Sequence, residues 1–184
     1  MLITRRLALA VAGTLAAGAS VRKPLAAGGL PSLASVLVPV DPPVELPEVS
    51  FVAADGTPHR LSEFAGHGMV VNFWATWCGP CVAELPALAA LSRTLAPDDI
   101  AVLTLSSDRG GAAVVQGYFD EHGITGLPVL LDLHGEGARA VGARGIPTSL
   151  VIDKRGRECA RLEGSADWSA PEAALMVRRL VGGG

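Results

Sequence analysis

The stretch WATWCGPC, residues 74–81, holds two of the three cysteines in this 184-residue chain, Cys78 and Cys81. Cysteines at this spacing serve as a metal clip, a structural disulfide or a reactive dithiol. Three cysteines are too few for a disulfide scaffold, and two thiolates fall short of the four ligands of a structural zinc site. The stretch therefore favours a reactive dithiol. Binding of Cu(I) by the two thiolates is the alternative from another class of function.

The residues on either side of the pair predict a strand and then a helix. MVVNFWA, residues 69–75, is a mostly apolar run of strand length, as expected for a central strand covered on both faces. After Cys81, leucines recur at helical spacing and the pattern ends near Pro97. The pair thus lies where a buried strand gives way to a helix.

That position predicts different roles for the two sulfurs. At a helix N-terminus, unpaired N–H groups and the macrodipole favour a thiolate at Cys78. In C-x-x-C motifs the pKa of the first thiol can fall from about 8.5 to roughly 3.5–7.5, which makes it a nucleophile at neutral pH. Cys81 lies one turn deeper, where it would resolve a mixed disulfide. Gly79 allows close backbone approach, and Pro80 is tolerated in the first helical turn.

Strands and helices alternate along the rest of the chain. Asp55-Gly56 is a turn signal between two short strand-like runs and predicts an N-terminal hairpin. The alternation predicts an α/β sheet with helices on both sides. Further strands are expected at 100–106, 127–132, 148–153 and 157–163, and further helices at 112–123, 136–141 and 169–180.

The first part of the chain has the composition of an export leader. A basic pair precedes an uncharged, alanine-rich stretch in residues 1–27, which predicts an export signal or, as second choice, a short membrane anchor. Thr4-Arg5-Arg6-Leu7 resembles a twin-arginine signal. Residues 28–47 are rich in proline and predict a flexible linker, which leaves 48–181 as the folded domain.

Charge argues against a nucleic-acid partner. The chain has a formal net charge of -3, and the leader carries four of its 15 basic residues. The remainder has 11 basic against 18 acidic side chains, a balance that disfavours binding to phosphates.

NFWATWCGPCVAELPAL (72–88) and GARGIPTSLVID (142–153) together resemble thioredoxin-fold proteins. Within that fold they are similar to the exported TlpA/ResA/CcmG-like thiol-disulfide reductases, over about residues 48–181. The resemblance implies a thioredoxin-like α/β fold, with a central mixed sheet flanked by helices, an N-terminal hairpin and an inserted helix-containing segment. It also implies a cis peptide before Pro147, packed against the cysteines, with the Ile146 backbone pairing with an extended substrate segment.

One difference from cytoplasmic thioredoxins bears on proton transfer. They carry a buried aspartate where this chain has Asn72, and an asparagine cannot accept the proton of the resolving cysteine. Glu84 matches a glutamate of the TlpA/ResA-like proteins and shares a helix face with Cys81, so we assign it that role as a hypothesis. The alternative is a solvated helix glutamate. Trp77 has two open interpretations, shaping access to Cys78 or capping the core.

The sequence-based prediction is an exported thiol-disulfide oxidoreductase that reduces protein disulfides in the bacterial periplasm. The family resemblance implies apocytochrome c thiols or the copper-site cysteines of cytochrome oxidase as substrates, and a membrane reductase of DsbD/CcdA type as the electron donor. A disulfide oxidant is the rival within the same class. We expect a monomer, no metal, and no cofactor besides the cysteine pair, and we expect Cys159 to be inert. The predicted catalytic residues are Cys78, Cys81 and Glu84, and the predicted substrate-binding residues are Trp77, Gly79, Pro80, Ile146 and Pro147.

Overall fold

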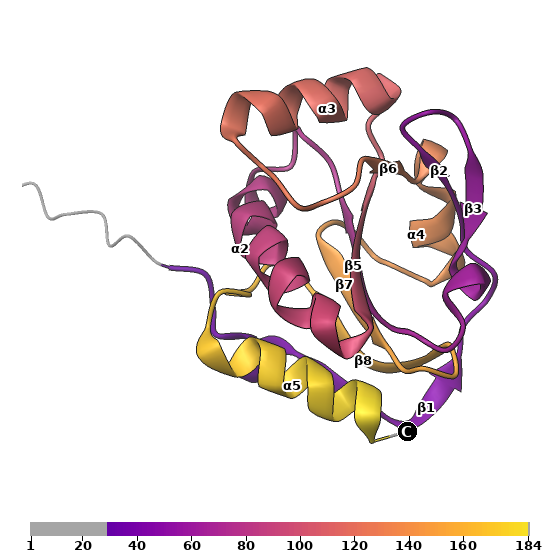
Figure 1. The fold of residues 1–184 in the computed structure, drawn as a ribbon, viewed down its shortest axis with the longest axis vertical. Helices are drawn as coiled ribbons and strands as arrows, with labels where there is room; N and C mark the ends of the chain where they lie inside the picture. The colour runs from indigo at the N-terminus through magenta and orange to yellow at the C-terminus, as the bar shows by residue number, and fades with distance from the viewer. Residues whose placement is uncertain (1–28, 184) are drawn as a thin grey trace, which may run out of the picture.

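A computed structural model describes residues 29–183, which form an eight-stranded mixed sheet flanked by helices (Figure 1). The strands follow the order β1-β8-β7-β4-β5-β6-β2-β3 across the sheet. Their bounds are β1 Val38–Glu45, β2 Ser50–Ala53, β3 Pro58–Arg60, β4 Gly68–Trp74, β5 Ile100–Ser106, β6 Leu130–Leu131, β7 Thr148–Ile152 and β8 Arg157–Glu163. This arrangement confirms the predicted α/β fold class.

Strand β4 is the central element, and every one of its residues is buried. It runs parallel to β5 and antiparallel to β7, with Asn72 opposite Ser149 in the register. Successive side chains of a strand point to opposite faces of the sheet. Val70 and Trp74 therefore join one hydrophobic core and Val71 the other, which places Asn72 on the face shared with Val70 and Trp74.

The helices divide between the two faces of the sheet. Helices α2, α3 and α5 and the short α1 contribute to the core that contains Val70 and Trp74, whereas α4 packs against the opposite face with the N-terminal hairpin. Figure 1 shows α5 alongside α2, and α3 across the end of the sheet near the start of α2. The bounds are α1 Leu33–Val36, α2 Gly79–Leu95, α3 Gly111–His122, α4 Glu136–Ala140 and α5 Pro171–Gly182, with 3-10 turns at Leu61–Phe64, Ala96–Asp98 and Leu133–Gly135.

The prediction of a flexible linker over residues 28–47 is wrong. Within this segment α1 buries Leu33 completely, and β1 pairs antiparallel with β8 at the edge of the sheet. Proline is tolerated on an edge strand, where it removes no donor that a second neighbour needs. The ladder is irregular between Pro39 and Val44, around the cis Asp41–Pro42 peptide. The fold therefore begins well before the predicted boundary at residue 48.

Most other predicted elements are present. Strands β2 and β3 form the expected hairpin around Asp55-Gly56, although the strand predicted at 127–132 is reduced to β6. Between β5 and β7 the chain forms α3, β6 and α4. The predicted leader, residues 1–27, lies outside the described residues. Within residues 29–183, no helix is both long and apolar enough to cross a membrane.

Candidate active site

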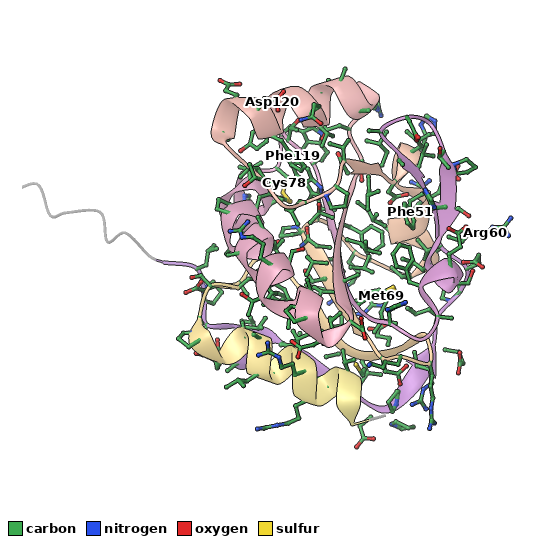
Figure 2. All side chains as sticks on the ribbon, viewed as in Figure 1. Phe51, Arg60, Met69, Cys78, Phe119 and Asp120 are labelled. Atoms are coloured by element: carbon green, nitrogen blue, oxygen red, sulfur yellow. A yellow bond between two sulfur atoms is a disulfide. The ribbon has the colours of Figure 1, made fainter. Side chains whose placement is uncertain are left out.

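The two cysteines lie at the start of α2 and are joined by a disulfide, with Cα atoms 5.2 Å apart (Figure 2). Cys78 is the N-cap residue, and its Sγ accepts a hydrogen bond from the backbone N–H of Cys81 at 3.3 Å. Pro80 occupies the first turn, where its missing N–H costs no helical bond. Cys81 is completely buried and Cys78 is 7% exposed, so the first sulfur is the one nearer to solvent, as predicted.

The loop before Cys78 is fixed by a buried carboxylate that was not among the predicted site residues. Asp108, just after β5, accepts hydrogen bonds from the Thr76 backbone N–H at 2.8 Å and the Thr76 hydroxyl at 2.7 Å. The Ser106 hydroxyl donates to the same carboxylate at 2.7 Å. Trp77, the next residue along, is 71% exposed. The interpretation of Trp77 as a core cap is therefore wrong, and its indole lies on the surface beside the cysteines.

The Gly-Ile-Pro-Thr motif, around residues 146 and 147, lies next to the cysteine pair in space. The Ile146–Pro147 peptide is cis, as predicted, and the Ile146 carbonyl oxygen lies 3.7 Å from Cys78 Sγ. Pro147 is buried, while its carbonyl oxygen accepts a hydrogen bond from the Gly164 N–H at 2.8 Å. The backbone of Ile146 thus forms the wall of the site nearest to the first sulfur.

Glu84 is completely buried, so the interpretation of a solvated helix glutamate is wrong. Its Oε1 accepts a hydrogen bond from Asn72 Nδ2 at 2.8 Å, and the same Nδ2 donates to Ser149 Oγ at 2.9 Å. Its Oε2 accepts from the Ala166 backbone N–H and from Trp168 Nε1, each at 3.2 Å. The carboxyl group of Glu84 therefore lies between α2, the sheet and the loop that precedes α5.

Burial raises the pKa of the Glu84 carboxyl from 4.5 to about 7. Removal from water penalises the charged form, and the hydrogen bonds from Ala166, Asn72 and Trp168 oppose that effect only in part. A carboxyl group with a pKa near 7 exchanges protons readily at neutral pH. Glu84 is thus a buried acid-base group one helical turn after Cys81.

A shallow cavity of about 230 Å³ opens beside the cysteines. Trp77 and Ile146, both predicted to bind substrate, contribute to its wall, as does the exposed Arg144. Gly79 and Pro80 are exposed at the start of α2, and Pro147 is buried beneath Ile146. The remaining lining residues, which the sequence did not single out, are Ser107, Gly135, Ala138, Ala143 and Gly145.

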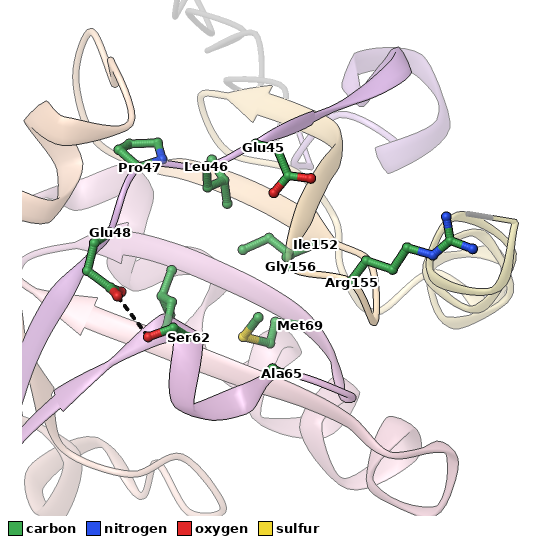
Figure 3. Close-up of a pocket in the computed structure, with 11 residues that line it drawn as sticks. Glu45, Leu46, Pro47, Glu48, Ser62, Ala65, Met69, Ile152, Arg155 and Gly156 are labelled. Atoms are coloured by element: carbon green, nitrogen blue, oxygen red, sulfur yellow. Dashed lines mark hydrogen bonds between the residues drawn. The ribbon is translucent and has the colours of Figure 1, made fainter.

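A larger cavity of about 380 Å³ lies at the other end of the sheet (Figure 3). Met69, at the start of β4, lines it together with Glu45, Glu48 and Arg155, and Figure 3 shows the Ser62 hydroxyl bonded to Glu48 at its rim. Strand β4 runs from this cavity to the cysteine loop. The larger cavity is therefore separate from the cysteine site.

Cys159 is isolated from the reactive pair. It is buried on β8, its Sγ lies 3.2 Å from the Val151 carbonyl oxygen, and burial raises the pKa of its thiol to about 11. This agrees with the predicted inert residue. Within the described part of the chain, no group of three or more His, Cys, Asp or Glu side chains is arranged to hold a metal ion.

Three residues of the site were not predicted from the sequence: Trp168, Ser149 and Asp108. Trp168 is 84 residues away from the carboxylate that its indole contacts, and no local pattern reveals a pairing at that separation. Asp108 gave a usable signal, because an acidic residue directly after an apolar strand often lies at the edge where functional loops gather.

The chain matches the Redoxin family over residues 43–174. It is 30% identical over 120 residues to the thiol-disulfide oxidoreductase ResA of Bacillus thuringiensis subsp. konkukian, covering 65% of this chain and 68% of that protein. A match to the thioredoxin-like protein YneN of Bacillus subtilis is 31% identical over 114 residues, covering 61% of this chain and 65% of YneN.

Solved structures show the same fold. The exposed lipoprotein thioredoxin of Streptococcus pneumoniae superposes with a TM-score of 0.60 and 28% identity, over 72% of this chain and 98% of that one. A thioredoxin family thiol:disulfide interchange protein of Chlorobium tepidum gives a TM-score of 0.59 and 28% identity, over 74% and 97%. The relatives and the paired cysteines confirm the predicted class, a thiol-disulfide oxidoreductase. The chain is a TlpA/ResA/CcmG-like thioredoxin-fold protein and belongs to the Redoxin family.

Proposed function

We propose that this protein is exported and reduces disulfides in partner proteins. The observation that carries the proposal is the pair of sulfurs at the start of α2, with Cys78 toward solvent and Cys81 enclosed. A sulfur at a helix N-terminus is stabilised as a thiolate, and the thiolate is the form that attacks disulfides. The Gly79-Pro80 dipeptide is that of the reducing thioredoxins, whose reduction potential is about -270 mV.

The reaction begins when the Cys78 thiolate attacks one sulfur of the partner's disulfide. A mixed disulfide forms, and the other partner sulfur leaves as a thiolate. Cys81 then gives up its proton and attacks Cys78 Sγ, which releases the second partner sulfur. The partner gains two electrons, and the protein is left with the Cys78–Cys81 disulfide.

Glu84 is the acceptor of the Cys81 proton in this mechanism. Support comes from its position one turn after Cys81 on α2, its complete burial, and a pKa raised to about 7. Asn72, its neighbour on β4, has no group that takes up a proton at neutral pH. Glu84→Gln should remove the part of the pH profile of disulfide exchange that follows the ionisation of Glu84.

The substrate segment would lie across the cavity beside Trp77 and Ile146. An extended chain there can pair with the Ile146 backbone, which brings its disulfide to Cys78. We propose apocytochrome c or the cysteines of a cytochrome oxidase copper site as the physiological substrates, and a DsbD/CcdA-type membrane reductase as the donor that restores the dithiol. The proposed setting is the periplasm, reached through the leader by the twin-arginine route. The proposed state is a monomer that needs no cofactor beyond its cysteines.

The test is Cys81→Ala in the native host. Without the resolving sulfur, partners should accumulate as mixed disulfides on Cys78, and reductant should release them for identification by mass spectrometry. The control is the Cys78→Ala/Cys81→Ala double variant, which lacks both reactive sulfurs and keeps only the buried Cys159. Trapped proteins with C-x-x-C-H haem-attachment motifs would support the cytochrome c role. A reduction potential far above the thioredoxin range would contradict the reductase and indicate the oxidant.

A further inference from the structure

Two of the three hydrogen bonds to Glu84 come from one short loop, residues 164–168, between β8 and α5. The Ala166 N–H and the Trp168 indole N–H both donate to Oε2, whereas Asn72 Nδ2 donates to Oε1. Trp168 is 1% exposed and Ala166 is completely buried, so water does not compete for this oxygen. The loop therefore supplies both hydrogen bonds to one of the two carboxylate oxygens.

The loop is held at both ends by backbone hydrogen bonds. At one end the Gly164 N–H donates to the carbonyl oxygen of Pro147, the cis-proline beside the cysteines, at 2.8 Å. At the other end the Asp167 N–H donates to the Pro31 carbonyl oxygen, also at 2.8 Å, and Ser32 forms a parallel bridge with Asp167. The loop is thus fixed between the substrate-facing wall and the N-terminal segment.

The N-terminal segment, residues 31–37, has its own anchor in the core. Leu33 is completely buried in the same hydrophobic core as Trp168, and α1 packs against α5. Burying a leucine side chain contributes about 1.5–3 kcal/mol. The segment is therefore held firmly enough to restrain the loop that it contacts.

No charged side chain offsets these hydrogen bonds. Strands β4 and β7 and helix α1 contain no ionisable residue, and α2 contributes only Cys81 near Glu84. Within residues 29–183 Glu84 forms no ion pair. The ionisable groups of the neighbouring loop and of α5 are engaged elsewhere or exposed: Asp167 accepts from Ser169, Glu172 accepts from Ser32, Arg178 pairs with Asp98, and Arg179 is exposed.

We propose that Trp168 is a positioning residue of the exchange reaction, whose indole N–H fixes the Glu84 carboxylate and favours its charged form, and that residues 31–37 hold Trp168 in place. The inference rests on the proposed function of Glu84 as proton acceptor. A donor to a carboxylate stabilises the ionised state, so loss of the indole N–H makes Glu84 harder to ionise. Trp168 acts through Glu84, to which its indole N–H donates.

The test compares Trp168→Phe with Trp74→Phe. Both changes keep an aromatic ring and remove a buried indole N–H, but the N–H of Trp74 has no hydrogen-bond partner among the described residues. Trp168→Phe should move the Glu84-dependent midpoint of the pH profile of insulin disulfide reduction upward by about one pH unit. Trp74→Phe should leave that midpoint in place.

A double variant separates this inference from the proposed function. In a Glu84→Gln background, Trp168→Phe should cause no further shift. If Glu84→Gln itself leaves the profile unchanged, the proton-acceptor role fails. Two outcomes overturn the positioning role of Trp168 while the proposed function stands. In the first, Glu84→Gln removes the Glu84-dependent part of the pH profile, but Trp168→Phe does not move its midpoint. In the second, Trp168→Phe shifts a part of the profile that persists in Glu84→Gln.

Two further measurements do not depend on Trp168→Phe folding. In the unaltered protein labelled with ¹⁵N, the indole N–H resonance of Trp168 should follow the Glu84 titration and that of Trp74 should not; a Trp168 resonance that stays constant through the titration contradicts the contact. Leu33→Ala should speed hydrogen exchange at the Ala166 amide and the Trp168 indole. Unchanged exchange at both would refute the restraint by residues 31–37.

Discussion

Asn72 Nδ2 lies 2.8 Å from Glu84 Oε1, which joins the central strand β4 to the helix that carries both reactive cysteines. The amide offers a donor where an aspartate would offer a second negative charge. Because the two side chains are completely buried, this difference decides which group can exchange a proton. In this chain Glu84 is that group.

The first prediction concerns stability and pH. The pKa of Glu84 is about 7 in the folded protein against 4.5 for an unperturbed glutamate. Between these values the folded state binds a proton that the unfolded state has lost, so the free energy of unfolding falls as pH rises. The full loss is on the order of 3 kcal/mol, reached above pH 7.

Urea denaturation of the unaltered protein and of Glu84→Gln, from pH 4 to pH 8, measures this effect. The difference in free energy of unfolding between the two proteins should change between about pH 4.5 and pH 7 and level off above pH 7. Parallel curves for the two proteins throughout would mean that Glu84 titrates as an ordinary glutamate.

A second prediction concerns the N-terminal segment. Leu33 is completely buried and sits in a segment that the sequence had suggested was a linker. Leu33→Ala in the full chain should lower the free energy of unfolding by about 2–5 kcal/mol, the usual cost of such a cavity. Val38→Ala is the matched control, because Val38 is 62% exposed and should change stability little. Equal effects of the two changes in urea denaturation would contradict a structural role for this segment.

A third prediction concerns the loop before Cys78. Asp108→Ala leaves the Thr76 N–H, the Thr76 hydroxyl and the Ser106 hydroxyl without their acceptor. Stability should fall by about 1–3 kcal/mol, and the rate of insulin disulfide reduction should fall with it because the loop that carries Cys78 loosens. Thr76→Val removes only one of these bonds and should have an intermediate effect. If Asp108→Ala exchanges disulfides at the original rate, the anchor is not needed for reactivity.

Local signals were enough to predict the cysteine loop and the hairpin at Asp55-Gly56, since each depends on neighbouring residues. The cis peptide at Pro147 was predicted only from the resemblance to a known family. Strand β1 was missed because its prolines are typical of a linker. Its position at the edge of the sheet, which makes proline tolerable, is a property of the whole fold. The contact of Glu84 with Trp168 was out of reach for the same reason, because only the folded chain brings them together.

We infer that the start of α2 keeps Cys78 ionised and reactive. The most direct measurement is the rate at which iodoacetamide alkylates Cys78 in the reduced protein between pH 4 and pH 9, with free cysteine measured alongside and the modified residue identified by mass spectrometry. We predict that Cys78 reacts near its maximal rate at pH 7, where free cysteine, with a pKa of about 8.5, is still mostly protonated, and that Cys81 and Cys159 stay unmodified. A Cys78 rate that rises with pH in step with free cysteine would contradict the account.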